Sequence, residues 1–219
     1  LILPRWATGR GVTRTITGCP GSLHESFVAP EGAFTPSNRS YSITCWVYDR
    51  TTGTLHAGER LPLAAIDWHL AGREKPFPVS TWQAGPVAVE TRLFVHQTSV
   101  GETTQEIAFY QCNVKNISKK DARIFLFLAI RPYSITKSMY AFNRGYHPVR
   151  ELQFDPDTNA VTVNGEVGVV PLQAPTAFGC TSLMHGFDIC EFASRGALPL
   201  RPRIQDWSGL ASGAYQFAC

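Results

Sequence analysis

Three stretches of the chain alternate apolar and polar residues with a period of two, and this pattern constrains the fold more than any other feature. The stretches are residues 41–48, 86–96 and 105–114. A period of two places successive side chains on opposite faces of an extended backbone, so each stretch is predicted to be a half-buried β-strand. In the second stretch, Val89 lies on the apolar face, and Glu90 is expected on the solvent face.

Two further patterns extend this prediction. Residues 123–130 are nearly all apolar, which is typical of a central strand covered on both faces. Together with residues 86–96 and 105–114, they are predicted to form an antiparallel meander. Asn164-Gly165 stands between two β-branched runs and predicts a tight hairpin.

Evidence for helices is weak. Residues 61–82 and 134–147 are interrupted by Pro or Gly or lack a periodic pattern, so we expect long loops or short helical turns there. Residues 187–192 are predicted to form a late strand. So many strands with two apolar faces require two packed sheets, and 219 residues fit one domain. The prediction is an all-β fold, a large antiparallel two-sheet supersandwich with long loops and little helix, as a single domain over residues 1–219.

Charge and hydropathy exclude several partners. The net charge is only +3 and the basic residues are scattered, so no nucleic-acid partner is expected. No apolar run approaches the length of a membrane span, so no membrane partner is expected. The chain has no signal peptide, which favours a cytoplasmic location. It has no initiator Met and stops at Cys219 after an apolar stretch, so we expect a fragment of a longer multidomain chain.

Local motifs assign neither a catalytic residue, nor a cofactor, nor a metal site. The chain has no Gly-x-Ser-x-Gly elbow, His-Glu-x-x-His motif or phosphate-binding loop. Asp155, Asp157, Asn159 and Glu166 match four positions of a calcium-binding loop, but Ala160 replaces the glycine that such a loop needs. We therefore expect turn chemistry at these residues and no metal.

The histidine and cysteine residues leave alternatives open. His185 and Asp188 are close enough in sequence to form a catalytic base and its orienting group, or only a loop hydrogen bond. Cys180 and Cys190 could form a disulfide bond in an oxidising compartment. Cys45 and Cys112 lie in apolar runs, where free cysteine behaves as a small buried hydrophobic residue.

The candidate binding residues are Trp68, Arg73 and Trp82. We expect the segment 67–82 to cross the mouth of one sheet with these three side chains at an exposed edge. Flat aromatic surfaces beside a guanidinium group suit a sugar or a protein partner. The alternative is that both tryptophans fold under the loop and close the end of the sandwich.

Several segments together resemble a known module, the N-terminal β-supersandwich domain of bacterial six-hairpin (α/α-barrel) glycosidase- and phosphorylase-like proteins. The resemblance extends over about residues 40–219 and is carried by the strand ends and turns at residues 81–85, 114–118, 129–132, 154–165 and 209–217.

This resemblance implies a non-catalytic accessory domain of a carbohydrate-active enzyme, because in that family the catalytic carboxylates belong to the barrel. It also implies two partners: a C-terminal α/α-barrel domain of the same chain, and carbohydrate at the sugar site that the domain would border. An alternative is a self-contained, mutarotase-like enzyme that uses a histidine and a carboxylate as acid and base, chosen from His96, His147, His185, Glu151 and Glu191. A third hypothesis is a secreted adhesion sandwich, which requires oxidised cysteines.

Overall fold

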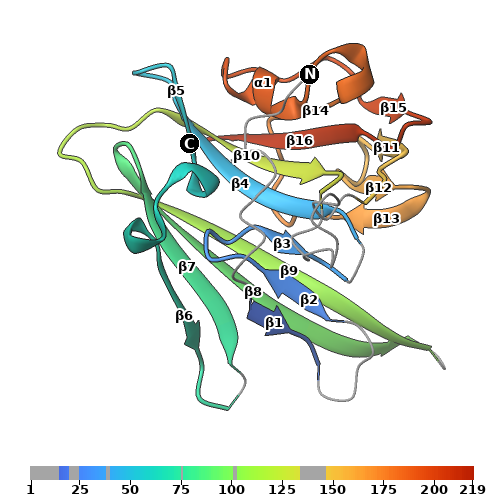
Figure 1. Ribbon diagram of the computed structural model, residues 1–219, viewed down its shortest axis with the longest axis horizontal. Coiled ribbons are helices and arrows are strands. Elements are labelled where there is room, and N and C mark those ends of the chain that lie inside the picture. Colours follow the sequence, from blue (N-terminus) through green and yellow to red (C-terminus); the bar gives the residue numbers. More distant parts are fainter. Residues whose placement is uncertain (1–14, 20–24, 38–39, 75, 101–102, 134–146) are drawn as a thin grey trace.

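The computed structural model of the protein describes residues 15–19, 25–37, 40–74, 76–100, 103–133 and 147–219, and these residues are nearly all β (Figure 1). The large sheet has eight strands: β1 (Thr15–Thr17), β2 (Ser26–Val28), β3 (Phe34–Thr35), β4 (Ser42–Asp49), β5 (Thr54–Ala57), β10 (Ile124–Arg131), β14 (Ala177–Ser182) and β16 (Ala211–Ala218). Its order is β1-β2-β3-β4-β10-β16-β14, and β5 also pairs with β4.

Two smaller antiparallel sheets complete the fold. The β6–β9 sheet contains β6 (Asp67–Ala71), β7 (Phe77–Ala84), β8 (Val87–Val100) and β9 (Thr103–Asn116), in that order. The β11–β15 sheet contains β11 (Glu151–Phe154), β12 (Val161–Val163), β13 (Glu166–Val169) and β15 (Arg203–Gln205). The helical elements are short: η2 (Gly58–Arg60), η3 (Leu63–Ala65), η4 (Leu183–His185) and α1 (Ile189–Ala193).

The large sheet is covered on both faces. Cys45 and Val47 of β4 pack against Val89 of the β6–β9 sheet. Farther along the same face, Ile130 packs with Leu152 of the β11–β15 sheet. On the opposite face, Trp46 and Phe127 pack against α1, which lies on the side of the large sheet away from β8 and β9 (Figure 1). The expected all-β sandwich is confirmed, with two small sheets facing one large sheet.

The alternating patterns correspond to strands. Residues 41–48 form β4, with Trp46 on the face opposite Ile43, and residues 86–96 and 105–114 form the long hairpin β8–β9. The strands extend beyond the predicted ranges: β8 continues through Val100 and β9 begins at Thr103. Asn164 and Gly165 adopt φ angles of 55° and 87°, as the predicted tight turn between β12 and β13 requires.

The predicted meander is wrong at its third strand. Strand β10 does not pair with β9 but crosses to the large sheet, between β4 and β16. Phe127 and Ile130 lie on opposite faces of β10 and both are fully buried. Such a strand needs cover on both sides, which only the middle of the large sheet provides.

The prediction of long loops or short helical turns for residues 61–82 is correct for the short turn η3 and wrong for the rest, because β6 and most of β7 also lie there. Pro78 is tolerated in β7 since it lies just before Val79, the first residue that pairs with β8. Of the other predicted long loop, residues 134–147, all but His147 lie outside the described residues.

The predicted strand at residues 187–192 is instead mainly α1. Asp188 is the N-cap of this helix, and its Oδ1 accepts a hydrogen bond of 3.0 Å from the backbone N–H of Cys190. The spacing of Asp188 and Glu191 is that of a helix-capping pair, a signal in the sequence that the apolar pattern obscured.

Candidate functional site

The three candidate binding residues do not form one site. Trp82 lies on β7, is only 3% exposed, and packs between the two sheets with Val47 and Val89. Trp68 lies on the edge strand β6 with 41% of its surface exposed, and Arg73 is exposed in the turn between β6 and β7. The expected exposed position of Trp82 is therefore wrong, and the alternative, a tryptophan sealed in the sandwich, is correct for this residue.

His185 and Asp188 do not form a catalytic pair. Asp188 is 1% exposed, and its Oδ2 is 3.3 Å from a guanidinium nitrogen of Arg131, which is also buried. This guanidinium group lies over the rings of Trp46 and Tyr133, with its carbon 5.4 and 4.7 Å from the ring centres. These contacts hold the Asp188 side chain in the core beneath α1, where it stabilises the fold.

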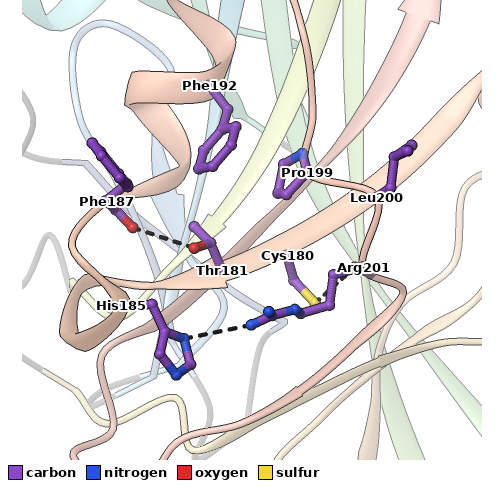
Figure 2. A pocket seen from close by; sticks show the side chains of 8 residues that line it. All are labelled: Cys180, Thr181, His185, Phe187, Phe192, Pro199, Leu200 and Arg201. Carbon is purple, nitrogen blue, oxygen red and sulfur yellow. Dashed lines mark hydrogen bonds between the residues drawn. The ribbon is translucent and has the colours of Figure 1, made fainter.

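A pocket of about 270 Å³ contains His185 (Figure 2). His185 contacts Arg201, whose Nη1 lies 3.5 Å from the His185 Nδ1 atom. The pocket is lined by Cys180, Thr181, His185, Phe187, Phe192, Pro199, Leu200 and Arg201, at the edge strand β14. This lining includes no carboxylate, so the pocket does not provide an acid and base pair.

The other residues considered for a sugar-converting enzyme are also dispersed. Glu151 forms an ion pair with Arg203, 3.0 Å away. Glu191 lies on α1, His96 on β8, and burial lowers the pKa of His147. Within the described part of the chain, none of the nominated histidines contacts either nominated glutamate.

Cys180 and Cys190 lie on opposite faces of the large sheet, so a disulfide bond between them is not formed. Cys45 is buried and Cys112 is half-buried, as their apolar surroundings predicted. The Sγ atoms of Cys45 and Cys112 are only 3.2 Å apart.

The calcium-like segment is a polar turn. Asp155 accepts hydrogen bonds from the backbone N–H of Asp157, at 3.0 Å, and from the Thr158 hydroxyl, at 2.7 Å. Glu166 lies beyond the turn, on β13. No group of three metal-ligating side chains occurs among residues that the structure describes.

A more coherent arrangement lies on the face of the β6–β9 sheet that points away from the large sheet, which we call the open face. The side chains in register across the four strands form three rows. The first row is Asp67, Thr81, Glu90 and Asn113, the second is His69, Val79, Arg92 and Gln111, and the third is Phe77, Phe94 and Phe109.

The first two rows of the open face form a polar network. Arg92 Nε lies 2.9 Å from Glu90 Oε1, which also accepts a hydrogen bond of 3.2 Å from the Asn113 amide. Gln111 donates in turn to the Asn113 Oδ1 atom, at 3.2 Å. The hydrogen bond from Asn113, with Arg92 and His69 adding to it, lowers the pKa of Glu90, so this carboxylate is a charged acceptor at neutral pH.

The third row of the open face is a platform of phenyl rings. The rings of Phe94 and Phe109 are nearly parallel, with centres 5.1 Å apart, and Phe77 meets Phe94 edge-on at 6.5 Å. Phe94 keeps 41% of its surface exposed. Apolar rings on a solvent-facing sheet surface, next to a fixed set of donors and acceptors, suit a ligand with both apolar faces and hydroxyl groups.

Sequence reasoning missed this site although its pattern is visible in the chain. The period of two placed Glu90, Arg92 and His96 on one side of β8, and Glu90 was expected on a solvent face, as observed. The neighbours of these residues come from β6, β7 and β9, so the rows become visible only once the register of four strands is known.

Comparisons of the chain with protein-family models, with curated proteins and with solved structures found no match. Within the described residues, no helix has the length and hydropathy that crossing a membrane requires.

Proposed function

We propose that this chain is a non-catalytic, carbohydrate-binding β-sandwich domain of a carbohydrate-active enzyme, and that its open face holds the sugar. The observation that carries the proposal is the row of phenyl rings beside the network of Glu90, Arg92, Gln111 and Asn113. The resemblance of residues 40–219 to the accessory domain of glycosidase- and phosphorylase-like proteins supports the same function.

The chemistry of the open face matches that of a sugar ring. A pyranose presents C–H groups on its flat faces and hydroxyl groups at its rim, so it can stack on a phenyl ring while its rim forms hydrogen bonds. Glu90 accepts from hydroxyl groups, the Arg92 guanidinium donates to them, and the Gln111 amide can do both. Since these side chains hold one another in place, little conformational entropy is lost when a ligand binds.

A second group of exposed side chains suits contact with a further domain. Several large apolar side chains in the C-terminal third of the chain are exposed: Val167, Val170, Leu172, Met184, Phe187, Leu200 and Trp207. The turns that carry Met184 and Trp207 are joined by a short hydrogen bond between Ser182 and Asp206. Exposed apolar side chains favour a protein partner, and in the proposed parent enzyme this partner is the α/α barrel.

The coding sequence that follows the Cys219 codon tests the proposed partner domain directly, because it should encode a helical barrel.

Titration calorimetry with soluble glucan, xylan and mannan oligosaccharides tests the binding function. The Phe94→Ala variant should bind the preferred glycan about tenfold more weakly, because it removes the central ring of the platform. The matched control is Leu172→Ala, which removes an exposed apolar side chain elsewhere and should leave the affinity unchanged. If the folded protein binds none of these glycans, or if both variants bind equally, the proposal is wrong.

A second candidate function, a mutarotase-like enzyme, is favoured by one contact. His69 Nδ1 lies 3.6 Å from Asp67 Oδ1 on the open face, which places a histidine and a carboxylate beside the proposed sugar surface. Both side chains are more than half exposed, so the pair is in contact with water rather than enclosed in a cleft. Polarimetry separates the two functions: an enzyme accelerates the anomerisation of glucose or galactose and loses this activity in His69→Ala, whereas a binding domain leaves the buffer rate unchanged.

A further inference from the structure

The two sheets of the sandwich approach each other closely at a pair of cysteines. Cys45 lies on β4 of the large sheet and Cys112 on β9, and both side chains point into the space between the sheets. Their sulfur atoms are 3.2 Å apart, closer than two sulfur atoms in ordinary van der Waals contact. A disulfide bond is about 2 Å long, so the atoms need to approach by only about 1 Å more.

We propose that Cys45 and Cys112 are a cross-linking site, at which oxidation joins the two sheets by a disulfide bond. The oxidant is a low-molecular-mass disulfide such as oxidised glutathione. One cysteine sulfur attacks the glutathione disulfide, gives a mixed disulfide and releases one reduced glutathione. The other cysteine sulfur then attacks the mixed disulfide, forms the Cys45–Cys112 bond and releases the second reduced glutathione, while both thiol protons end on the two released thiols.

The position of the pair distinguishes it from the other cysteines. Cys180 and Cys190 are buried on opposite faces of the large sheet. Cys19 is half-buried, and its Sγ atom lies 3.6 Å from the Val95 carbonyl oxygen on β8. Cys219 is exposed just after β16, and burial, with the nearby Cys112 adding to it, raises the pKa of its thiol. Cys219 is therefore a competing partner for Cys112. Cys45 and Cys112 are far apart in sequence, and a bond between them would close a loop that contains β5 to β8.

The consequence is a covalent clamp between the sheets. The β6–β9 sheet is joined to the large sheet by side-chain packing, and the open face lies on its far side. A disulfide bond that spans two packed sheets restricts the unfolded chain and stabilises the sandwich, as it does in antibody domains. The bond would therefore hold the proposed binding surface in its folded form under oxidising conditions.

The experiment compares reduced and oxidised protein. The full chain is incubated with excess oxidised glutathione, either folded or during refolding from urea, and is then alkylated, digested and analysed by mass spectrometry. We expect a linked peptide pair that contains Cys45 and Cys112, lighter by two hydrogen atoms than the separate peptides. The melting temperature should rise by about 10 °C, and dithiothreitol should reverse the rise.

Matched variants separate this site from its competitors. The Cys219→Ser variant should still form the bond and show the rise in melting temperature. The Cys112→Ala and Cys45→Ala variants should show neither, and two variants are used so that a failure of one to fold does not decide the result. A linked pair containing Cys219 in place of Cys45, or no linked peptide after both treatments, would overturn the proposal.

Discussion

At the scale of single residues, a buried carboxyl group contacts two side chains of β4. Glu59 of η2 is 8% exposed and accepts hydrogen bonds from the Thr44 hydroxyl, at 2.5 Å, and from the Trp46 indole, at 3.4 Å. Burial raises the pKa of Glu59, although these two donors and the nearby Arg131 act in the opposite direction. Buried carboxyl groups of this kind make the stability of a protein depend on pH.

The first prediction concerns this pH dependence. Because the pKa of Glu59 is raised in the folded protein, the unfolded chain loses this proton first as the pH rises above about 4.3, the usual value for glutamate. The stabilisation by this group is complete below that pH and is lost as the pH rises through the folded pKa. In Glu59→Gln the amide oxygen can still accept from Thr44, so the variant should gain stability relative to the wild type as the pH rises from 4 to 7.

Thermal melts of both proteins across this pH range measure the effect. The difference between the two melting temperatures should increase with pH. A constant difference would mean that Glu59 titrates as an exposed glutamate does, in contradiction to its burial.

The second prediction concerns Trp82, which sequence reasoning placed at a binding edge. Because its indole fills the space between the sheets, Trp82→Ala should lower the free energy of unfolding by about 3–5 kcal/mol. The control is Trp207→Ala, since Trp207 is 84% exposed, and its cost should be under about 0.5 kcal/mol. Urea denaturation measures both values. An unchanged stability of Trp82→Ala together with weaker sugar binding would restore the original prediction.

At the scale of elements, the sequence predicts strands well where one face is polar and the other apolar. Strands β4, β8 and β9 and the β12–β13 turn follow from their own residues, because period and turn chemistry are local properties. Strand pairing is not local. The residues of 123–130 do not indicate whether β10 pairs with β4 or with β9. The open face likewise depends on the register of four strands, which no single strand determines.

The third prediction tests the β12–β13 turn. Gly165 has a φ angle of 87°, and an added Cβ atom would have no neighbour within 4 Å, so Gly165→Ala should cost about 1 kcal/mol through backbone strain alone. Asn164 has a second role: its side chain accepts from the backbone N–H groups of Arg150 and Glu151 and donates to the carbonyl of Pro148. Asn164→Gly keeps the turn but removes these three bonds, and should cost about 1–2 kcal/mol.

Chemical denaturation of the two variants measures these costs. Equal stability of Asn164→Gly and the wild type would show that the three side-chain bonds contribute nothing beyond the turn itself.

At the scale of the whole molecule, the large sheet connects all parts of the core. Neighbouring residues of β4 serve different clusters: Trp46 packs under α1, whereas Val47 packs against the β6–β9 sheet. In β10, Phe127 likewise packs against α1, whereas Ile130 packs against the β11–β15 sheet. The hydrophobic clusters therefore share strands of the large sheet. If one cluster unfolded alone, apolar side chains of the neighbouring clusters would become exposed to water.

The last prediction is that the chain unfolds as one cooperative unit, as expected of a single domain. Trp46 and Trp82 are the buried tryptophans among the described residues, and they lie on opposite faces of the large sheet. Urea unfolding is followed by circular dichroism, which reports all strands, and by the fluorescence of Trp46→Phe and Trp82→Phe variants, each of which retains one of these two reporters. For each variant, fluorescence and circular dichroism should give the same midpoint. A fluorescence transition of Trp82 that precedes the loss of strand signal would mean that the β6–β9 sheet is a separate folding unit, and the open face would then need the Cys45–Cys112 bond or a partner domain to remain folded.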